Sequence, residues 1–273
     1  MIQKTGIILK ELERAIFKKT PFGLIRFGDG GLKYINAFLV NNKKKLIDIT
    51  NQEGIPYNNN EQILKLWSQS ANICNYIDSP EVYFTQDFWK RSKGISRKKI
   101  SRETEILLKN WRQLYQKIGI NNSNFCNPEI NFLSCLNNQF EKNLPEILIN
   151  KKICCISSRS DINKILPGYN IKVIKISGKN EYQFVRNFDN VISHISNNAK
   201  KYDIWLVSAG EVGRIYTGTI KFFGGISFDI GSLIDYWCTG EVPSRLLPYM
   251  KGSMINKMNL LLTSRGRKYK EYI

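Results

Sequence analysis

The chain has 273 residues, 42% of them hydrophobic and 12% aromatic, enough to bury the core of a single α/β domain over residues 1–273. Its formal net charge of +18 favours polyanions, anionic membrane surfaces or phosphorylated ligands as partners. No apolar run approaches the roughly 20 residues that span a bilayer, and the N-terminus has no signal-peptide pattern, so a cytoplasmic location is expected.

Two features of the composition limit these expectations. Heavy use of Lys, Asn and Ile indicates a bias toward AT-rich codons, which is an alternative origin of the positive charge. His194 is the only histidine, and the six cysteines form no C-x-x-C pair. The sequence therefore excludes a multi-histidine metal site and disfavours a zinc site, a disulfide framework and histidine-dependent nucleophilic catalysis.

In the first half, hydrophobic periodicity predicts helices separated by a few apolar strands. The expected helices are residues 6–18, 32–39, 58–76, 105–118 and 131–140. The expected strands are 22–27 and 81–89, with a polar break at 41–45. The basic, polar stretch 90–104 is expected to be a mobile loop.

In the second half, strands and helices alternate. The expected strands are 152–157, 171–176, 204–209 and 226–230, and the expected helices are 161–166, 181–199, 212–223 and 233–237. Continuous apolar strands alternating with helices are typical of a parallel sheet covered on both faces. The sequence thus predicts a Rossmann-like α/β fold, in which ligands lie beyond the carboxyl ends of the strands.

The stretch 23–35 is the most informative in the chain, because an apolar strand runs there into a glycine-rich turn that opens a helix. Such a turn presents backbone N–H groups to a phosphate, and Gly28 and Gly30 permit its close approach. Arg26 adds a planar fork for phosphate. Asp29 adds a carboxylate that can hold a sugar hydroxyl, a metal or a proton. The alternative is an ordinary Asp-Gly turn.

Polar residues also follow the later strands. Ser157 and Arg159 suit a phosphate or uracil contact, or else cap the next helix. Glu211 suits a general base or a ligand for the donor sugar, but a carboxylate in a first helical turn is also a simple cap. Asp229 is a ligand contact or an N-cap. Tyr216 and Trp237 are expected in the core.

Two segments together resemble the GT-D-type glycosyltransferases. The first is Arg26-Phe-Gly-Asp-Gly30, and the second comprises residues 206–211, 224–231 and 235–237. Residues 40–145 are not part of the resemblance. The resemblance implies a sheet that binds a nucleoside-diphosphate sugar. Carried over position by position, the implied donor contacts are Arg26, Gly28 and Asp29. The resemblance places Ser208, Gly210 and Glu211 beside the diphosphate or sugar, and Asp229 and Asp235 at the end of the fourth strand and just beyond.

One position departs from the family pattern. The pattern ends in Asp-x-Glu, whose two carboxylates hold a divalent cation, and here the third position is Gly31. A hard cation needs several oxygen ligands, so Asp29 alone is a poor anchor. Either Glu211, Asp229 or Asp235 supplies the missing oxygen, or the enzyme works without manganese or magnesium, or activity has been lost.

The expected function is therefore transfer of a sugar from a UDP- or GDP-sugar to a hydroxyl of a glycan, glycoprotein or lipid-linked acceptor, with peripheral membrane contact allowed by the charge. Asp29, Glu211 or Asp235 would take the acceptor's proton, and Arg26 and Arg159 would stabilise the leaving diphosphate. Two alternatives remain: an S-adenosylmethionine-dependent methyltransferase and a basic nucleic-acid-binding protein without catalysis.

Overall fold

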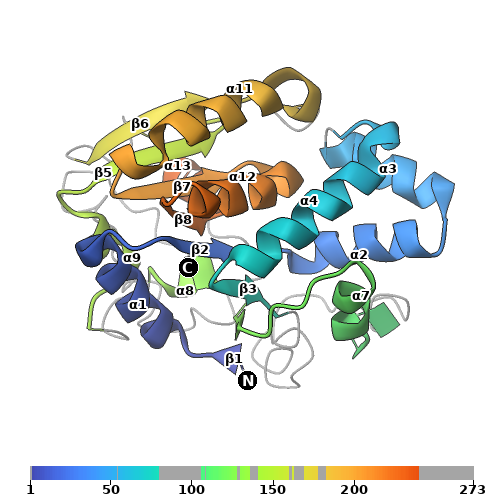
Figure 1. Cartoon of the computed structure of the whole chain (residues 1–273), viewed down its shortest axis with the longest axis horizontal. Helices are drawn as coiled ribbons and strands as arrows, with labels where there is room; N and C mark the ends of the chain where they lie inside the picture. The colour runs from blue at the N-terminus through green and yellow to red at the C-terminus, as the bar shows by residue number, and fades with distance from the viewer. Residues whose placement is uncertain are drawn as a thin grey trace, which may run out of the picture.

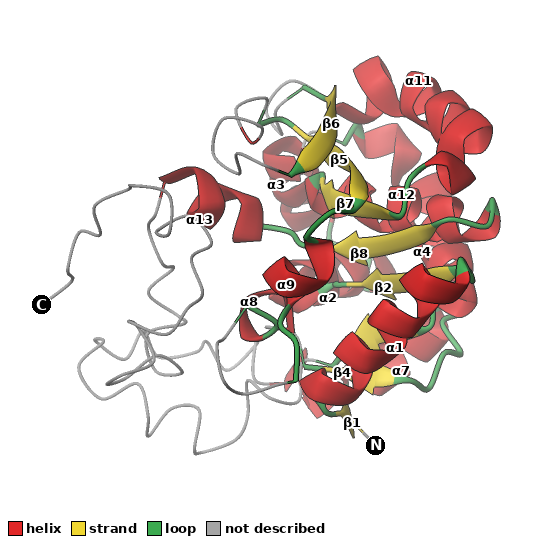
Figure 2. Cartoon of the chain, turned by 90° about the vertical axis from the view of Figure 1, so that its left-hand side faces the viewer, coloured by secondary structure: helices red, strands yellow, loops and turns green. Residues whose placement is uncertain are grey.

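The computed structural model describes residues 2–53, 55–79, 106–107, 109–127, 130–135, 141–159, 162, 169–177 and 183–239. Within these residues, eight strands form one sheet in the order β1-β4-β3-β2-β8-β7-β5-β6. All seven neighbouring pairs are parallel, and Figure 2 shows the strands pointing toward the side where α13 lies. The predicted Rossmann-like α/β class is confirmed.

The strands are short. They are β1 (Ile2–Gln3), β2 (Phe22–Ile25), β3 (Tyr76–Asp78), β4 (Phe125–Cys126), β5 (Lys152–Ser157), β6 (Asn170–Lys175), β7 (Ile204–Ser208) and β8 (Ile226–Asp229). The first helices are α1 (Thr5–Lys18), α2 (Gly28–Leu39), α3 (Lys43–Glu53), the 3-10 turn η1 (Tyr57–Asn59) and α4 (Asn60–Ile73). The later ones are α7 (Trp111–Lys117), α8 (Ile130–Leu133), α9 (Leu144–Leu148), α11 (Gln183–Asn198), η4 (Ala199–Lys201), α12 (Gly210–Phe222) and α13 (Leu233–Thr239).

The centre of the sheet joins the two ends of the described chain. Strand β2 pairs with β8 in the register Phe22 to Ile226 and Leu24 to Phe228. Strands β3 and β4 continue the sheet on one side, and β7, β5 and β6 continue it on the other. Parallel pairing brings the carboxyl ends of all these strands to one edge. The two segments of the family resemblance therefore meet at the middle of that edge.

Helices cover both faces of the sheet, and each face has its own core (Figure 1). Successive strand residues point to opposite faces, so Ile153 and Cys155 join one core while Cys154 and Ile156 join the other. The first core includes side chains of α1, α9 and α13, and the second includes side chains of α2, α4, α11 and α12. The adjacent thiols of β5 are fully buried, as expected for small apolar residues.

The first half differs from the expectation in several places. The helix predicted over 58–76 ends at Ile73, and Tyr76–Asp78 is strand β3. The expected polar break at 41–45 contains the start of α3, and the helix expected from residue 32 begins at Gly28. Strands β1 and β4 and helix α9 carried too few residues for a periodic signal.

The second half agrees closely with the expectation. Strands β5, β6, β7 and β8 and helices α11, α12 and α13 all lie where the alternation predicts them. The predicted strand 81–89, the loop 90–104 and most of the helix 161–166 lie outside the described residues, as does the end of the helix predicted over 131–140.

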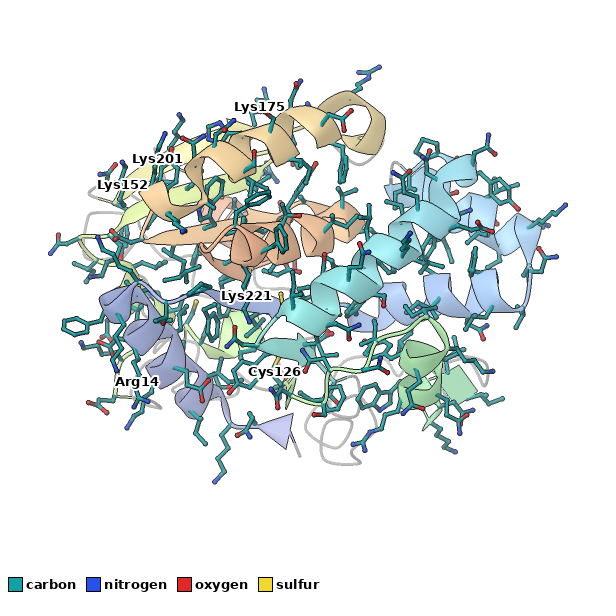
Figure 3. The ribbon with its side chains drawn as sticks, in the orientation of Figure 1. Arg14, Cys126, Lys152, Lys175, Lys201 and Lys221 are labelled. Atoms are coloured by element: carbon teal, nitrogen blue, oxygen red, sulfur yellow. The ribbon has the colours of Figure 1, made fainter. Side chains whose placement is uncertain are left out.

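Basic side chains on the described surface are spread over several elements. Arg14, Lys152, Lys175 and Lys201 come from α1, β5, β6 and η4, and each is exposed (Figure 3). Among the described residues, no helix combines the length and the apolar character needed to cross a membrane.

Candidate active site

The carboxyl edge of the sheet is marked by three glycines with left-handed backbone. Gly28 follows β2 with φ 59°, Gly210 follows β7 with φ 53°, and Gly231 follows β8 with φ 46°. Glycine adopts these angles without the steric cost that a side chain imposes. A Cβ built on Gly28 would meet no described atom within 4 Å, so the β2–α2 turn borders open space.

Arg26 and Asp229 meet at the centre of this edge. The backbone N–H of Arg26 donates to Asp229 Oδ2 over 3.2 Å, and the N–H of Gly231 donates to Oδ1 over 3.0 Å. A Cβ on Gly231 would lie 2.5 Å from Arg26 Nη1, so the guanidinium packs directly against this glycine. Burial raises the pKa of Asp229 to about 6, although the charge of Arg26 opposes the rise.

A second buried carboxylate, Asp78, ends β3 beside the same turn. Its Oδ1 accepts from the N–H of Phe27 over 2.6 Å, and its Oδ2 accepts from the N–H of Gly28 over 2.7 Å. Burial raises the pKa of Asp78, whereas these hydrogen bonds and the charge of Arg26 act to lower it. The sequence predicts a turn that offers its N–H groups to a phosphate, but in the structure Asp78 takes two of them.

The opposite side of the turn is held by Arg214 of α12. Arg214 Nε donates to the carbonyl of Arg26 over 3.0 Å, and Nη2 donates to the carbonyl of Phe27 over 2.5 Å. Its guanidinium also lies 4.4 Å from the ring centroid of Trp67 and 5.0 Å from that of Phe27. These cation–π contacts and hydrogen bonds replace the water that a buried guanidinium loses.

Glu211 lies one helical turn before Arg214 and forms an ion pair with it. The Glu211 side chain is also close to the β2–α2 turn, since a Cβ on Gly30 would lie 3.4 Å from Oε1. The Glu211 carbonyl accepts from Trp67 Nε1 over 3.0 Å. Because Arg214 neutralises this carboxylate, Glu211 is poorly suited to take a proton or to bind a cation.

Gly31, the position where the family pattern has glutamate, faces the same arginine. A Cβ there would lie 3.2 Å from Arg214 Nη2 and 3.2 Å from Phe27 Cβ and Cδ1. The described carboxylates Glu211, Asp78 and Asp229 are each bound by protein donors. Within the described residues, which do not include the Asp29 side chain, no group of three or more His, Cys, Asp or Glu could hold a metal ion.

A second group of predicted residues lies at the ends of β5 and α13. Ser157 is buried, pairs in register with Ser208 of β7, and accepts the Arg159 N–H over 3.0 Å. Arg159 Nε donates to Asp235 Oδ1 over 3.1 Å, and both side chains are largely exposed. Asp235 therefore lies on the outer side of α13, paired with a cation.

The structure brings most of the predicted residues to one edge. Three of them, Arg26, Gly28 and Gly30, lie in or next to the β2–α2 turn. The side chains of Glu211 and Asp229 lie beside it. Asp29 lies in the first turn of α2, and its side chain is outside the described part of the structure. Tyr216 and Trp237 are core residues, as expected.

Sequence reasoning missed the residues that hold this turn. They are Asp78 and Arg214, and Trp67 packs against Phe27 and the Arg214 guanidinium. Asp78 ends a three-residue strand whose first residue, Tyr76, was predicted as the end of a helix, and a carboxylate directly after Tyr-Ile was the only available signal. Arg214 follows Glu211 at i+3, a spacing at which opposite charges meet on a helix.

No protein-family model, curated protein or solved structure matches this chain.

Proposed function

We propose that the protein is a glycosyltransferase that moves a sugar from a nucleoside-diphosphate-sugar donor to a hydroxyl of an acceptor. The observation that carries the proposal is the meeting of Arg26 and Asp229 beside three left-handed glycines at the carboxyl edge of the sheet. Ligands of open parallel sheets bind at this edge. An arginine fork beside a turn that borders open space suits a diphosphate.

The proposed chemistry has two requirements that different residues meet. Negative charge develops on the departing diphosphate, and Arg26, with Arg159 from the loop after β5, supplies fixed positive charge toward it. The acceptor hydroxyl must lose a proton as the new bond forms. Asp29 is the proposed base, because Glu211 is bound by Arg214, Asp229 accepts two backbone N–H groups and Asp235 is paired with Arg159.

The proposal expects that a divalent cation is not required. A carboxylate is missing at Gly31, and the nearest described replacement, Glu211, is neutralised by Arg214. The chain's own arginines are therefore assigned the role of neutralising the diphosphate. Acceptors with negative charge suit the net charge of +18.

The test is a panel of UDP- and GDP-sugars, with and without manganese, in which donor binding and donor hydrolysis are both measured. We expect one donor to bind the wild-type protein and both Arg26→Ala and Asp29→Ala to weaken its binding or turnover. S-adenosylmethionine serves as the contrasting ligand in a melting experiment. Stabilisation by S-adenosylmethionine alone, or wild-type donor binding in both variants, would contradict the proposal.

A further inference from the structure

We propose that Asp78 and Arg214 are positioning residues that together set the shape of the β2–α2 turn. Neither side chain is assigned a contact with the donor. Donor affinity would nevertheless depend on both, because Arg26 and Asp29 flank the peptide groups that these residues hold. The inference concerns the same site and rests on the proposed function.

The two side chains hold the same two peptide groups from opposite sides. In the peptide between Arg26 and Phe27, the carbonyl accepts from Arg214 Nε over 3.0 Å while the N–H donates to Asp78 Oδ1 over 2.6 Å. In the next peptide, between Phe27 and Gly28, the carbonyl accepts from Arg214 Nη2 over 2.5 Å while the N–H donates to Asp78 Oδ2 over 2.7 Å.

This arrangement uses the bidentate geometry of both charged groups. A trans peptide points its carbonyl and its N–H in opposite directions, so an acceptor pair and a donor pair on the two sides fix the orientation of its plane. The carboxylate offers two oxygens and the guanidinium offers a rigid fork, so each binds two successive peptides. A lysine at 214 could not reproduce the fork, and an asparagine at 78 could not accept twice through equivalent oxygens.

Burial makes a purely stabilising role a poor explanation. Asp78 is 0% exposed and Arg214 is 4% exposed, and removing such charges from water is costly. Buried ion networks are weak contributors to stability but can specify one conformation. Here the conformation specified is that of a turn whose next residue, Gly28, has φ 59° and borders open space.

The conformation of this turn also sets the position of Arg26. The backbone of Arg26 donates to Asp229, and its side chain packs against Gly231. Rotation of the 26–27 peptide would change the backbone angle ψ of Arg26 and shift this residue, with its guanidinium, relative to Asp229 and Gly231. Small displacements of binding groups weaken recognition strongly, so a loosened turn should bind the donor less tightly.

The first measurement follows the turn itself and needs no donor. Hydrogen exchange is compared over residues 26–31 in wild type, Asp78→Asn and Arg214→Lys. We expect exchange at least tenfold faster in both variants, confined to this segment. Asp203→Asn is the matched control for the carboxylate, since Asp203 accepts the N–H of Lys152 over 2.8 Å at the opposite edge of the sheet. Arg186→Lys, on the exposed surface of α11, is the control for the arginine.

The second measurement is the dissociation constant of the donor found in the screen. We expect an increase of roughly 10- to 100-fold in Asp78→Asn and Arg214→Lys, with wild-type values in both controls. Arg214→Lys retains the positive charge, so it remains informative if Asp78→Asn does not fold. Wild-type exchange in a folded variant, or faster exchange with wild-type donor affinity, would overturn the inference. A wild-type protein that binds no nucleotide sugar would instead refute the proposed function, while exchange would still decide whether these residues hold the turn.

Discussion

The backbone N–H of Arg26 donates to the Asp229 carboxylate over 3.2 Å, although the two residues are 203 positions apart in the chain. This contact places the arginine that directly follows β2 against the carboxylate that ends the neighbouring strand, β8. Asp229 therefore accepts hydrogen bonds although it is buried. The loss of its hydration is still the main influence on its pKa.

Asp229 predicts a pH dependence of stability. Its pKa in the folded protein is raised to about 6 from an ordinary 3.8, so the folded state binds this proton more tightly than the unfolded state. The resulting stability is present below pH 4 and is lost as the pH rises toward 6. In Asp229→Asn, the free energy of unfolding should therefore fall less over this pH range, by an amount on the order of 2 kcal/mol.

Urea denaturation at several pH values between 4 and 7 measures this effect. Part of the decline should persist in Asp229→Asn, because burial also raises the pKa of Asp78. Parallel curves for the wild-type and variant proteins across this range would contradict the prediction.

Two adjacent glycines of α2 should respond in opposite ways to alanine. A Cβ at Gly31 would lie 3.2 Å from Arg214 Nη2 and from Phe27, so we expect Gly31→Ala to cost about 1 kcal/mol. A Cβ at Gly30 would meet only Glu211 Oε1 at 3.4 Å, and alanine is the better helix former. Gly30→Ala should therefore be neutral or stabilising by thermal denaturation. Equal effects of the two substitutions would argue against tight packing of Arg214 on the turn.

The packing of α12 against α4 depends on Gly218. A Cβ there would lie 2.3 Å from Ser70 Cβ and 2.6 Å from Ser70 Cα, and backbone cannot move aside as a side-chain tip can. We expect Gly218→Ala to reduce the free energy of unfolding by about 2–3 kcal/mol. Gly213→Ala in the same helix is the matched control, since its Cβ would meet Val207 Cγ1 at 3.2 Å. A loss in Gly213→Ala as large as that in Gly218→Ala would contradict the expectation that the close approach to Ser70 sets the cost.

The ion pair of Arg159 and Asp235 separates function from stability. Both side chains are largely exposed, so Arg159→Ala should change the free energy of unfolding by less than about 0.5 kcal/mol. If Arg159 faces the diphosphate, loss of a charge-assisted hydrogen bond should raise the donor dissociation constant roughly tenfold. Titration calorimetry with the donor tests this. Lys10→Ala is the control, because it breaks the exposed ion pair between Lys10 of α1 and Glu141. This variant should bind the donor with wild-type affinity.

The sequence was most informative where the elements were long and regular. Strands such as β5 and β7 each contain a continuous run of four apolar residues, and the helices after them have clear apolar faces, so their order and type were predictable. Strand β3 has three residues and ends in Asp78, so it lacked both length and apolar character. The helix α3 begins with three lysines, which suggested a polar break.

The same contrast explains the site. Arg26 and Asp229 could be placed near each other because both follow strands expected in one parallel sheet. The partners of the turn could not be found, because Asp78 and Arg214 act through contacts across 51 and 187 or more positions that no local pattern records. Nor could the sequence show that Arg214 would occupy the carboxylate of Glu211.

The pairing of β2 with β8 has a consequence for biosynthesis. The first of these strands begins at Phe22 and the second ends at Asp229, so the centre of the sheet stays open on one side until nearly the whole described chain has been translated. Until then β2 can pair only with β3, and its other edge stays unpaired, a state that favours chaperone binding and slow, late closure. A truncated polypeptide that stops before residue 226 should accordingly emerge insoluble instead of partly active.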